Sequence, residues 1–117
     1  MEEIYCPICN IELMKHEAGQ CLNAWVVEEL KNDPWFNQLE TGLSIPYFSS
    51  RVIFAFPLME RVWEMDDGAV IHKNSIHVKA GDHIEDGNTY RVWKFITGET
   101  FPLCVCRAYL FLKSQEQ

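Results

Sequence analysis

Three cysteines and one histidine near the start of the chain have the types and spacing of metal ligands. Cys6 and Cys9 form a Cys-x-x-Cys pair, and His16 and Cys21 follow after six and four intervening residues. Structural zinc sites take four sulfur or nitrogen ligands in a tetrahedron, and a Cys-x-x-Cys turn supplies two of them. We therefore predict a zinc ion bound by Cys6, Cys9, His16 and Cys21, which clips an N-terminal arm (residues 1–14) to the domain that follows.

Two alternatives to zinc stay open for this cluster. In the first, Cys6 and Cys9 are a reduced pair in a flexible arm and Cys21 packs in the core. In the second, the pair is a redox motif, although no helix or βαβ unit is expected directly after it. The ligand order resembles that of a zinc knuckle, with a longer stretch between Cys9 and His16.

Histidines, carboxylates and the remaining cysteines form looser groups. His72 and His77 can meet across an expected hairpin, but two histidines without a third ligand make a poor metal site. Cys104 and Cys106 lie about 200° apart around an expected helix, so they cannot share an ion there; Cys106 is expected to be buried and Cys104 partly exposed.

The carboxylates are expected to form a solvated rim or, alternatively, an acidic face for a basic protein partner: Glu60, Glu64, Asp66, Asp67, Asp82, Glu85 and Asp86.

Composition limits the class of function. A chain of 117 residues with 48% apolar residues is one domain with an adequate core. The net charge of −7 opposes binding along a phosphate backbone, so a nucleic-acid partner is not expected. We expect no secretory leader and no membrane span, a cytoplasmic location, and reduced or metal-bound cysteines. No phosphate-binding glycine loop or Gly-x-Ser-x-Gly motif occurs, and no catalytic residue is predicted.

Hydrophobic periodicity predicts three helices. The first spans about residues 17–31, with an apolar stripe through Leu22, Val26 and Leu30. The second spans residues 51–65, capped by Ser49 or Ser50 and kinked or started late near Pro57. The third opens at residues 100–102 (Thr-Phe-Pro) and ends near residue 113, before a short disordered tail.

The pattern of residues 69–97 predicts strands connected by turns. Segments 69–73 and 76–79 flank Asn74-Ser75 as a hairpin, turns are expected at 81–82 and 86–88, and segment 89–96 alternates as a strand. Residues 33–49 form an expected connecting stretch. Its Trp35 and Tyr47, with Trp63 and Trp93, are expected in the core.

Three short sequence motifs, which follow one another in the same order along the chain, resemble those of the phage ABA sandwich domain, a family of small phage and prophage proteins. They are residues 16–26 (HEAGQCLNAWV), 46–50 (PYFSS) and 102–108 (PLCVCRA). The resemblance covers about residues 15–113. The chain departs from the pattern at Asn23, where an aspartate is usual, at Pro57 inside the second helix, and between the first two motifs.

The resemblance implies an α+β fold: an α/β/α sandwich with a central, largely antiparallel sheet and about three helices, in one domain (residues 15–113) followed by a polar tail (residues 114–117). It implies no catalytic activity. We expect a phage or prophage accessory protein that acts as a protein-binding module on a host, phage or defence protein, with a homodimer as a further alternative. Two other functions stay open: a zinc-containing nucleic-acid-binding or adaptor protein, and a protein that sequesters a small molecule or nucleotide.

Overall fold

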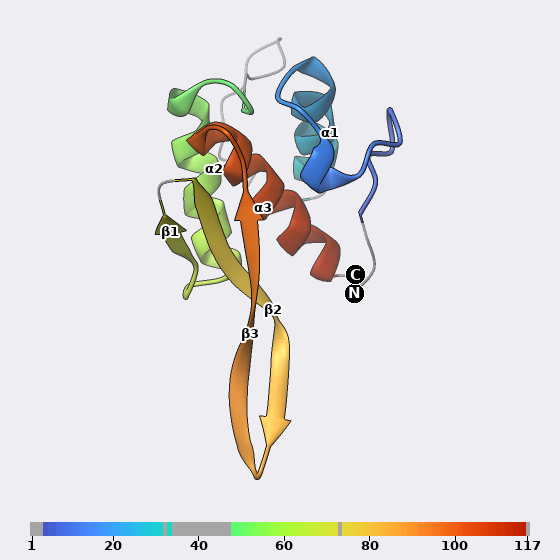
Figure 1. Ribbon diagram of the computed structural model, residues 1–117. Helices are drawn as coiled ribbons and strands as arrows, with labels where there is room; N and C mark the ends of the chain where they lie inside the picture. Colours follow the sequence, from blue (N-terminus) through green and yellow to red (C-terminus); the bar gives the residue numbers. More distant parts are fainter. Residues whose placement is uncertain (1–3, 32, 34–47, 73, 117) are drawn as a thin grey trace.

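The computed structural model of the chain describes residues 4–31, 33, 48–72 and 74–116 (Figure 1). In chain order the elements are the 3-10 helix η1 (Leu13–Lys15), α1 (Gln20–Leu30), α2 (Val52–Met65), β1 (Val70–His72), β2 (Ser75–Glu85), β3 (Asn88–Thr97) and α3 (Phe101–Gln115). Three α-helices and a three-stranded antiparallel sheet confirm the predicted α+β class. The predictions for Trp35, Pro46 and Tyr47 lie outside the described residues. None of the described helices is long and apolar enough to cross a membrane.

The sheet is a meander in the order β1-β2-β3. β1 pairs with β2 through His72 and Ser75, and the β2–β3 pairing ends at Glu85 and Asn88. Asp86 and Gly87 between the last two strands both have positive φ, at 53° and 81°, as a type I′ turn requires. The predicted turn at residues 81–82 is wrong, because this stretch continues β2; the glycine there belongs to a bulge between Lys79 and Gly81.

α3 is the central element of the core. Every residue from Pro102 to Leu112 is buried, as expected for a helix that is apolar on all sides. The Thr100 hydroxyl accepts a hydrogen bond from the Leu103 amide and caps the helix, as predicted. The predicted disordered tail is wrong up to Glu116: α3 continues to Gln115, and the Lys113 ammonium pairs with Glu116.

α2 begins at Val52 and contains Pro57 without a late start. Pro57 cannot donate to the carbonyl of Ile53, but Ile53 is exposed, so water can bond that oxygen instead. Neither Ser49 nor Ser50 caps α2, because the N-cap residue is Arg51 and it makes no side-chain cap.

Ser49 instead forms hydrogen bonds with the start of α1. α1 starts at Gln20, later than predicted, and the Gly19 amide before it donates to the Ser49 hydroxyl. The buried Asn23 side-chain oxygen accepts from both the amide and the hydroxyl of Ser49. These bonds join the start of α1 to the chain entering α2.

A buried carboxylate joins the other ends of the helices. Asp33, which follows α1, accepts hydrogen bonds from Arg61 of α2 (2.8 Å) and from the Tyr109 hydroxyl of α3 (3.1 Å). The Lys113 ammonium lies 3.7 Å from the same oxygen. Burial, and then the charge of Asp33, raise the pKa of Tyr109, so the hydroxyl stays protonated and donates.

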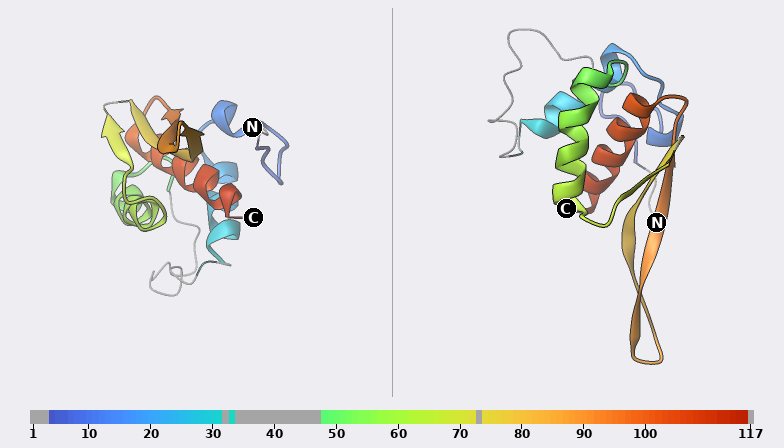
Figure 2. Two further views of the ribbon diagram at one scale, coloured as in Figure 1. Left: turned by 90° about the horizontal axis from the view of Figure 1, so that it is seen from below. Right: turned by 90° about the vertical axis from the view of Figure 1, so that its left-hand side faces the viewer.

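The described helices α2 and α3 lie on one side of the sheet, and the β2–β3 hairpin extends well beyond them (Figure 2). Residues 82–90 of this hairpin are exposed throughout and form what we call the arm. The side of the sheet that faces the helices carries Ile76, Val78 and Ile96, all buried.

Candidate metal centre

A tight loop at residues 5–12 presents the first two cysteines. Tyr5 and Glu12 form an antiparallel bridge, and the Cys6 amide donates to the carbonyl of Ile11 (2.9 Å). The Asn10 amide closes the turn onto the Cys6 carbonyl, and Asn10 has a φ of 63°, a conformation that asparagine tolerates better than most residues. The loop thus directs both side chains of the Cys-x-x-Cys pair to the same side.

Backbone groups in this loop form hydrogen bonds with both cysteine sulfurs. The Ile8 amide donates to the Cys6 sulfur at 3.4 Å. A hydrogen bond from the Ile11 backbone is the main cause that lowers the pKa of Cys9 below its usual value. A thiolate is the form of cysteine that binds a metal ion.

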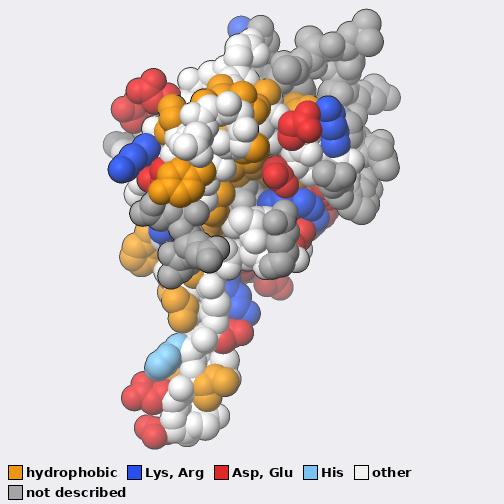
Figure 3. All heavy atoms as spheres, turned by 90° about the vertical axis from the view of Figure 1, so that its right-hand side faces the viewer, with side chains coloured by type: hydrophobic (Ala, Val, Ile, Leu, Met, Phe, Trp, Pro, Cys, Tyr) orange, Lys and Arg blue, Asp and Glu red, His pale blue; other side chains and the backbone are white. Residues whose placement is uncertain are grey.

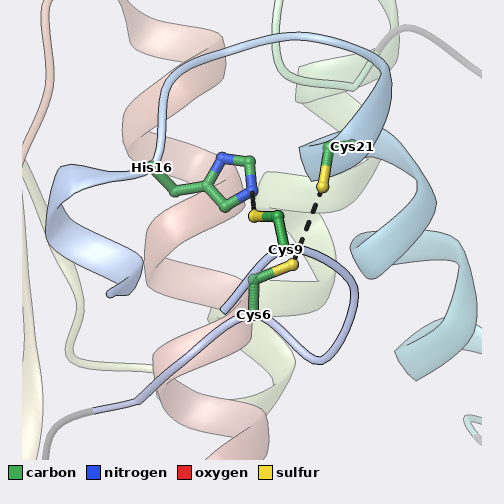
Figure 4. A group of neighbouring side chains, drawn as sticks. All are labelled: Cys6, Cys9, His16 and Cys21. Carbon is green, nitrogen blue, oxygen red and sulfur yellow. Dashed lines mark hydrogen bonds between the residues drawn. The ribbon is translucent and has the colours of Figure 1, made fainter. Parts of the chain in front are cut away.

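His16 follows η1 and is buried, with its ring 6.1 Å from that of Trp25. Its Nδ1 lies 2.9 Å from the carbonyl oxygen of Glu17. A carbonyl only accepts, so Nδ1 carries the proton and Nε2 of the neutral ring is left with a free lone pair. This Nε2 points at the Cys9 sulfur, 3.3 Å away (Figure 4).

Cys21 completes the group from the first turn of α1. Its sulfur lies 3.8 Å from that of Cys6. Burial raises the pKa of Cys21 to about 12, and the neighbouring Cys9 and Cys6 sulfurs add to the shift. Three thiolates this close repel one another, and a divalent cation among them reverses that repulsion.

The four ligand atoms all lie within 4.8 Å of one another, so this cluster can hold a metal ion. Zinc bonds of 2.3 Å to sulfur and 2.0–2.1 Å to nitrogen, at tetrahedral angles, place two sulfurs about 3.8 Å apart and a sulfur and a nitrogen about 3.5 Å apart. The sulfur–sulfur distance of 3.8 Å between Cys6 and Cys21 and the 3.3 Å from Cys9 to His16 are close to these values. The residues predicted as ligands are therefore brought together in a set compatible with zinc.

Arg107 supports the site and was not predicted from sequence. It is buried in α3, and its guanidinium donates to the carbonyl of His16 (2.8 Å) and to that of Thr97 at the end of β3 (2.7 Å). The signal in the sequence was a lone charged residue within the apolar segment 102–112. Arg107 thus ties the histidine ligand to the sheet.

The predicted acidic face divides between two elements. Glu60, Glu64 and Asp67 are exposed on α2 and just after it, whereas Asp82, Glu85 and Asp86 are exposed on the arm. Figure 3 shows acidic side chains at the end of the arm, away from the body. Asp66 is buried, at 7% exposure, so it is not available to a partner.

Asp66 instead fixes the arm to α2. Its carboxylate accepts from the Lys79 amide of β2 (2.8 Å), from the Gly68 amide (3.2 Å) and from the guanidinium of Arg91 of β3. Burial alone raises the pKa of Asp66, but these hydrogen bonds outweigh it, Arg91 most of all, and hold the pKa below its usual value.

The remaining cysteines and histidines form no further metal-ligand cluster among the residues that the structure describes. Cys106 is buried as predicted, and Cys104 is also buried rather than partly exposed, because its thiol contacts the carbonyls of Asn74 and Gly98. His72 and His77 do meet, with ring centroids 4.2 Å apart. His83 lies exposed on the arm.

The chain was compared with models of protein families, with curated proteins and with solved structures, and none of them matches it.

Proposed function

We propose that the protein is a zinc-stabilised, non-catalytic protein-binding module. The observation that carries this proposal is the Cys6, Cys9, His16 and Cys21 cluster, whose ligand atoms lie within 4.8 Å of one another. Zinc bound there joins residues 4–16 to α1. The ion supplies folding free energy to this part of the molecule rather than chemistry.

The ligand count argues for a structural ion. Catalytic zinc keeps a coordination position open for water or substrate, whereas four protein ligands fill the tetrahedron. Two buried carboxylates, Asp33 and Asp66, are both held by arginines, Arg61 and Arg91, so neither is free to act as an acid or base on a substrate.

Exposed apolar surface supports the binding part of the proposal. Ile53, Phe56 and Trp63 follow one another along the outer side of α2 and are 74%, 59% and 41% exposed. Apolar patches of this kind on a small domain mark interaction sites, and the net charge of −7 disfavours a nucleic acid as the partner. A host or defence protein as the target, as the phage resemblance implies, remains a prediction.

Metal analysis tests the proposal directly. Protein purified under reducing conditions without added chelator is expected to contain one zinc ion per chain, measured by elemental mass spectrometry. Replacing zinc with Co²⁺ is expected to give the visible spectrum of a tetrahedral thiolate site with no bound water. Protein that holds no zinc and takes up none on titration would refute the proposal.

A matched pair of variants localises the ion. Cys9→Ser removes an exposed ligand with little effect on packing, and it is expected to abolish stoichiometric zinc binding and to make the thermal midpoint insensitive to chelator. Cys104→Ser changes a thiol outside the cluster and is expected to keep one zinc per chain. Equal zinc content in both variants would place the ion elsewhere.

A further inference from the structure

The side of the sheet that faces away from the helices is unusually aromatic. Pairing places Val70 opposite His77, and His77 opposite Phe95, on this side of the three strands. His72 and Trp93 share it, with the His77 ring 4.2 Å from those of His72 and Phe95 and 6.5 Å from Trp93. We call these five residues the outer sheet face.

Much of this face is open to solvent in the single chain. Phe95 is 60% exposed, and Trp93 and Val70 are 41% exposed each. An antiparallel sheet with one covered face ordinarily turns polar residues to water on the other. Trp93 was expected in the core from sequence, and here the expectation is wrong, as it is for Trp63, which is also 41% exposed.

Two charged side chains beside the outer sheet face are paired within the described part of the chain. The Lys79 ammonium pairs with Asp82 at 3.1 Å, and Arg91 pairs with Asp66 while its guanidinium lies over the Trp93 ring at 4.2 Å. The five residues that define the face include no carboxylate. A basic partner would find no acidic group among these five, and of the cations that the structure describes beside them, Lys79 and Arg91 are already paired.

A neutral aromatic patch flanked by paired charges is compatible with its own copy. Protein interfaces are enriched in aromatic residues and arginine at the centre and depleted of unpaired charge. We propose that two copies of this chain pack outer sheet face to outer sheet face as an isologous dimer. This inference goes beyond the proposed function and does not depend on zinc.

The size of the surface limits the strength of such a dimer. The face covers residues 75–79 of β2, about 17 Å, and three strands spaced about 4.8 Å apart give it about 240 Å² in projection, before the relief of its side chains is added. A standard interface buries about 800 Å² of accessible surface on each partner. The face is smaller than this, so the dimer is expected to be weak and to dissociate on dilution.

The acidic arm tips restrict how the two copies are related. Sheets pack face to face with their strands roughly aligned. A two-fold axis lying between the sheets and perpendicular to the strands sends the two tips, each with Glu85 and Asp86, to opposite ends of the dimer. An axis along the strands would bring four carboxylates together at one end, so the first arrangement is favoured.

Sedimentation velocity over about 1 to 500 µM protein tests the proposal, because the dimer has twice the 13.7 kDa mass of one chain. Phe95→Glu places a charge at the centre of the face and is expected to give a single-chain mass at all concentrations. Its far-UV circular dichroism is expected to be unchanged, since Phe95 is outside the core. Ile53→Glu, at a more exposed position on α2, is the matched control and is expected to keep the dimer.

Three results would overturn the inference. They are a single-chain mass for the unmodified protein at the highest concentration, a dimer that survives Phe95→Glu, and a dimer that Ile53→Glu dissociates, which would place the contact on α2. A mass that keeps rising beyond two chains would also contradict it, because an isologous contact closes at two. None of these outcomes bears on the zinc content.

Discussion

At the scale of single residues, Arg107 shows what a buried cation does in this fold. Burial lowers the pKa of Arg107, which reflects the cost of removing the guanidinium from water. Its two hydrogen bonds to backbone carbonyls offset that cost and hold His16 and Thr97 beside α3. The residue stabilises the contact between three segments that are distant in sequence.

Arg107→Met is expected to lower the free energy of unfolding by about 2 kcal/mol, because the carbonyl of the buried His16 and that of Thr97 lose charged donors while the aliphatic volume is kept. Arg107→Lys keeps the charge but cannot reach both carbonyls, so its loss is expected to be smaller. Urea denaturation measures both values. A methionine variant within about 0.5 kcal/mol of the unmodified protein would show that the two bonds contribute little.

His77 gives the outer sheet face a dependence on pH. Loss of water around the ring, and then the nearby His72, lower the pKa of His77 below its usual value of 6.5. Its other ring contacts are the uncharged Trp93 and Phe95, and Nε2 lies 3.0 Å from the Ser75 hydroxyl. Among the described residues in these contacts, His72 is the one that can carry charge.

The direction of the pH effect follows from linkage. The unfolded chain takes up a proton at His77 at a higher pH than the folded chain does, so the free energy of unfolding falls as the pH drops below about 6.5 and levels off below the folded pKa. His77→Gln is expected to flatten this slope in urea denaturation between about pH 5 and 7.5. His83→Gln, on the exposed arm, is the control and is expected to leave the slope in place.

At the scale of elements, Asp66 decides the direction of the arm. An isolated two-stranded hairpin is marginally stable in water, so the hairpin depends on what fixes its base. Asp66 bonds to both of its strands, through Lys79 and Arg91, from the end of α2.

Asp66→Asn is expected to lower the free energy of unfolding by about 2 kcal/mol at neutral pH, since Arg91, itself 27% exposed, loses its charged partner. Because the folded pKa of Asp66 lies below its usual value of 3.8, its contribution is present above that value and is lost as the pH falls through the folded pKa. The asparagine variant should therefore lack part of the acid destabilisation below about pH 4. Denaturation at pH 7 and pH 3 checks both effects, and an equal loss at the two pH values would contradict this account.

The elements also show which parts of the structure could be predicted from sequence. Local signals sufficed for α3, with its Thr100 cap, for β3, and for the Asp86-Gly87 turn. They failed for Ser49, which sits just before α2 but caps α1 through a contact 30 residues away. The cluster of candidate metal ligands was predictable because coordination chemistry restricts residue type and spacing. Arg107 and Asp66 were not assigned their roles, because their partners are backbone atoms and side chains on other elements.

At the scale of the whole molecule, the core and the segment that carries three of the four candidate metal ligands are unequal in size. α3 alone contributes eleven buried residues, and α2 and the sheet pack on it. The stretch 4–16 contributes only Cys6, Leu13 and His16 to the buried set. If zinc is bound as proposed, removing it deprives a small peripheral part of a constraint and leaves most of the apolar burial intact.

Chelation is accordingly expected to open the N-terminal loop without unfolding the domain. In hydrogen exchange, the amides of Cys6, Asn10 and Leu13, which bond within this segment, should lose protection when zinc is removed. Amides in the middle of α3, such as Ala108 and Leu110, should keep it. Cys9→Ser should reproduce the exchange pattern of the chelated protein without chelator. Simultaneous loss of protection in both regions would show that zinc stabilises the fold as one cooperative unit, so that the sheet and α3 do not hold their structure without the ion.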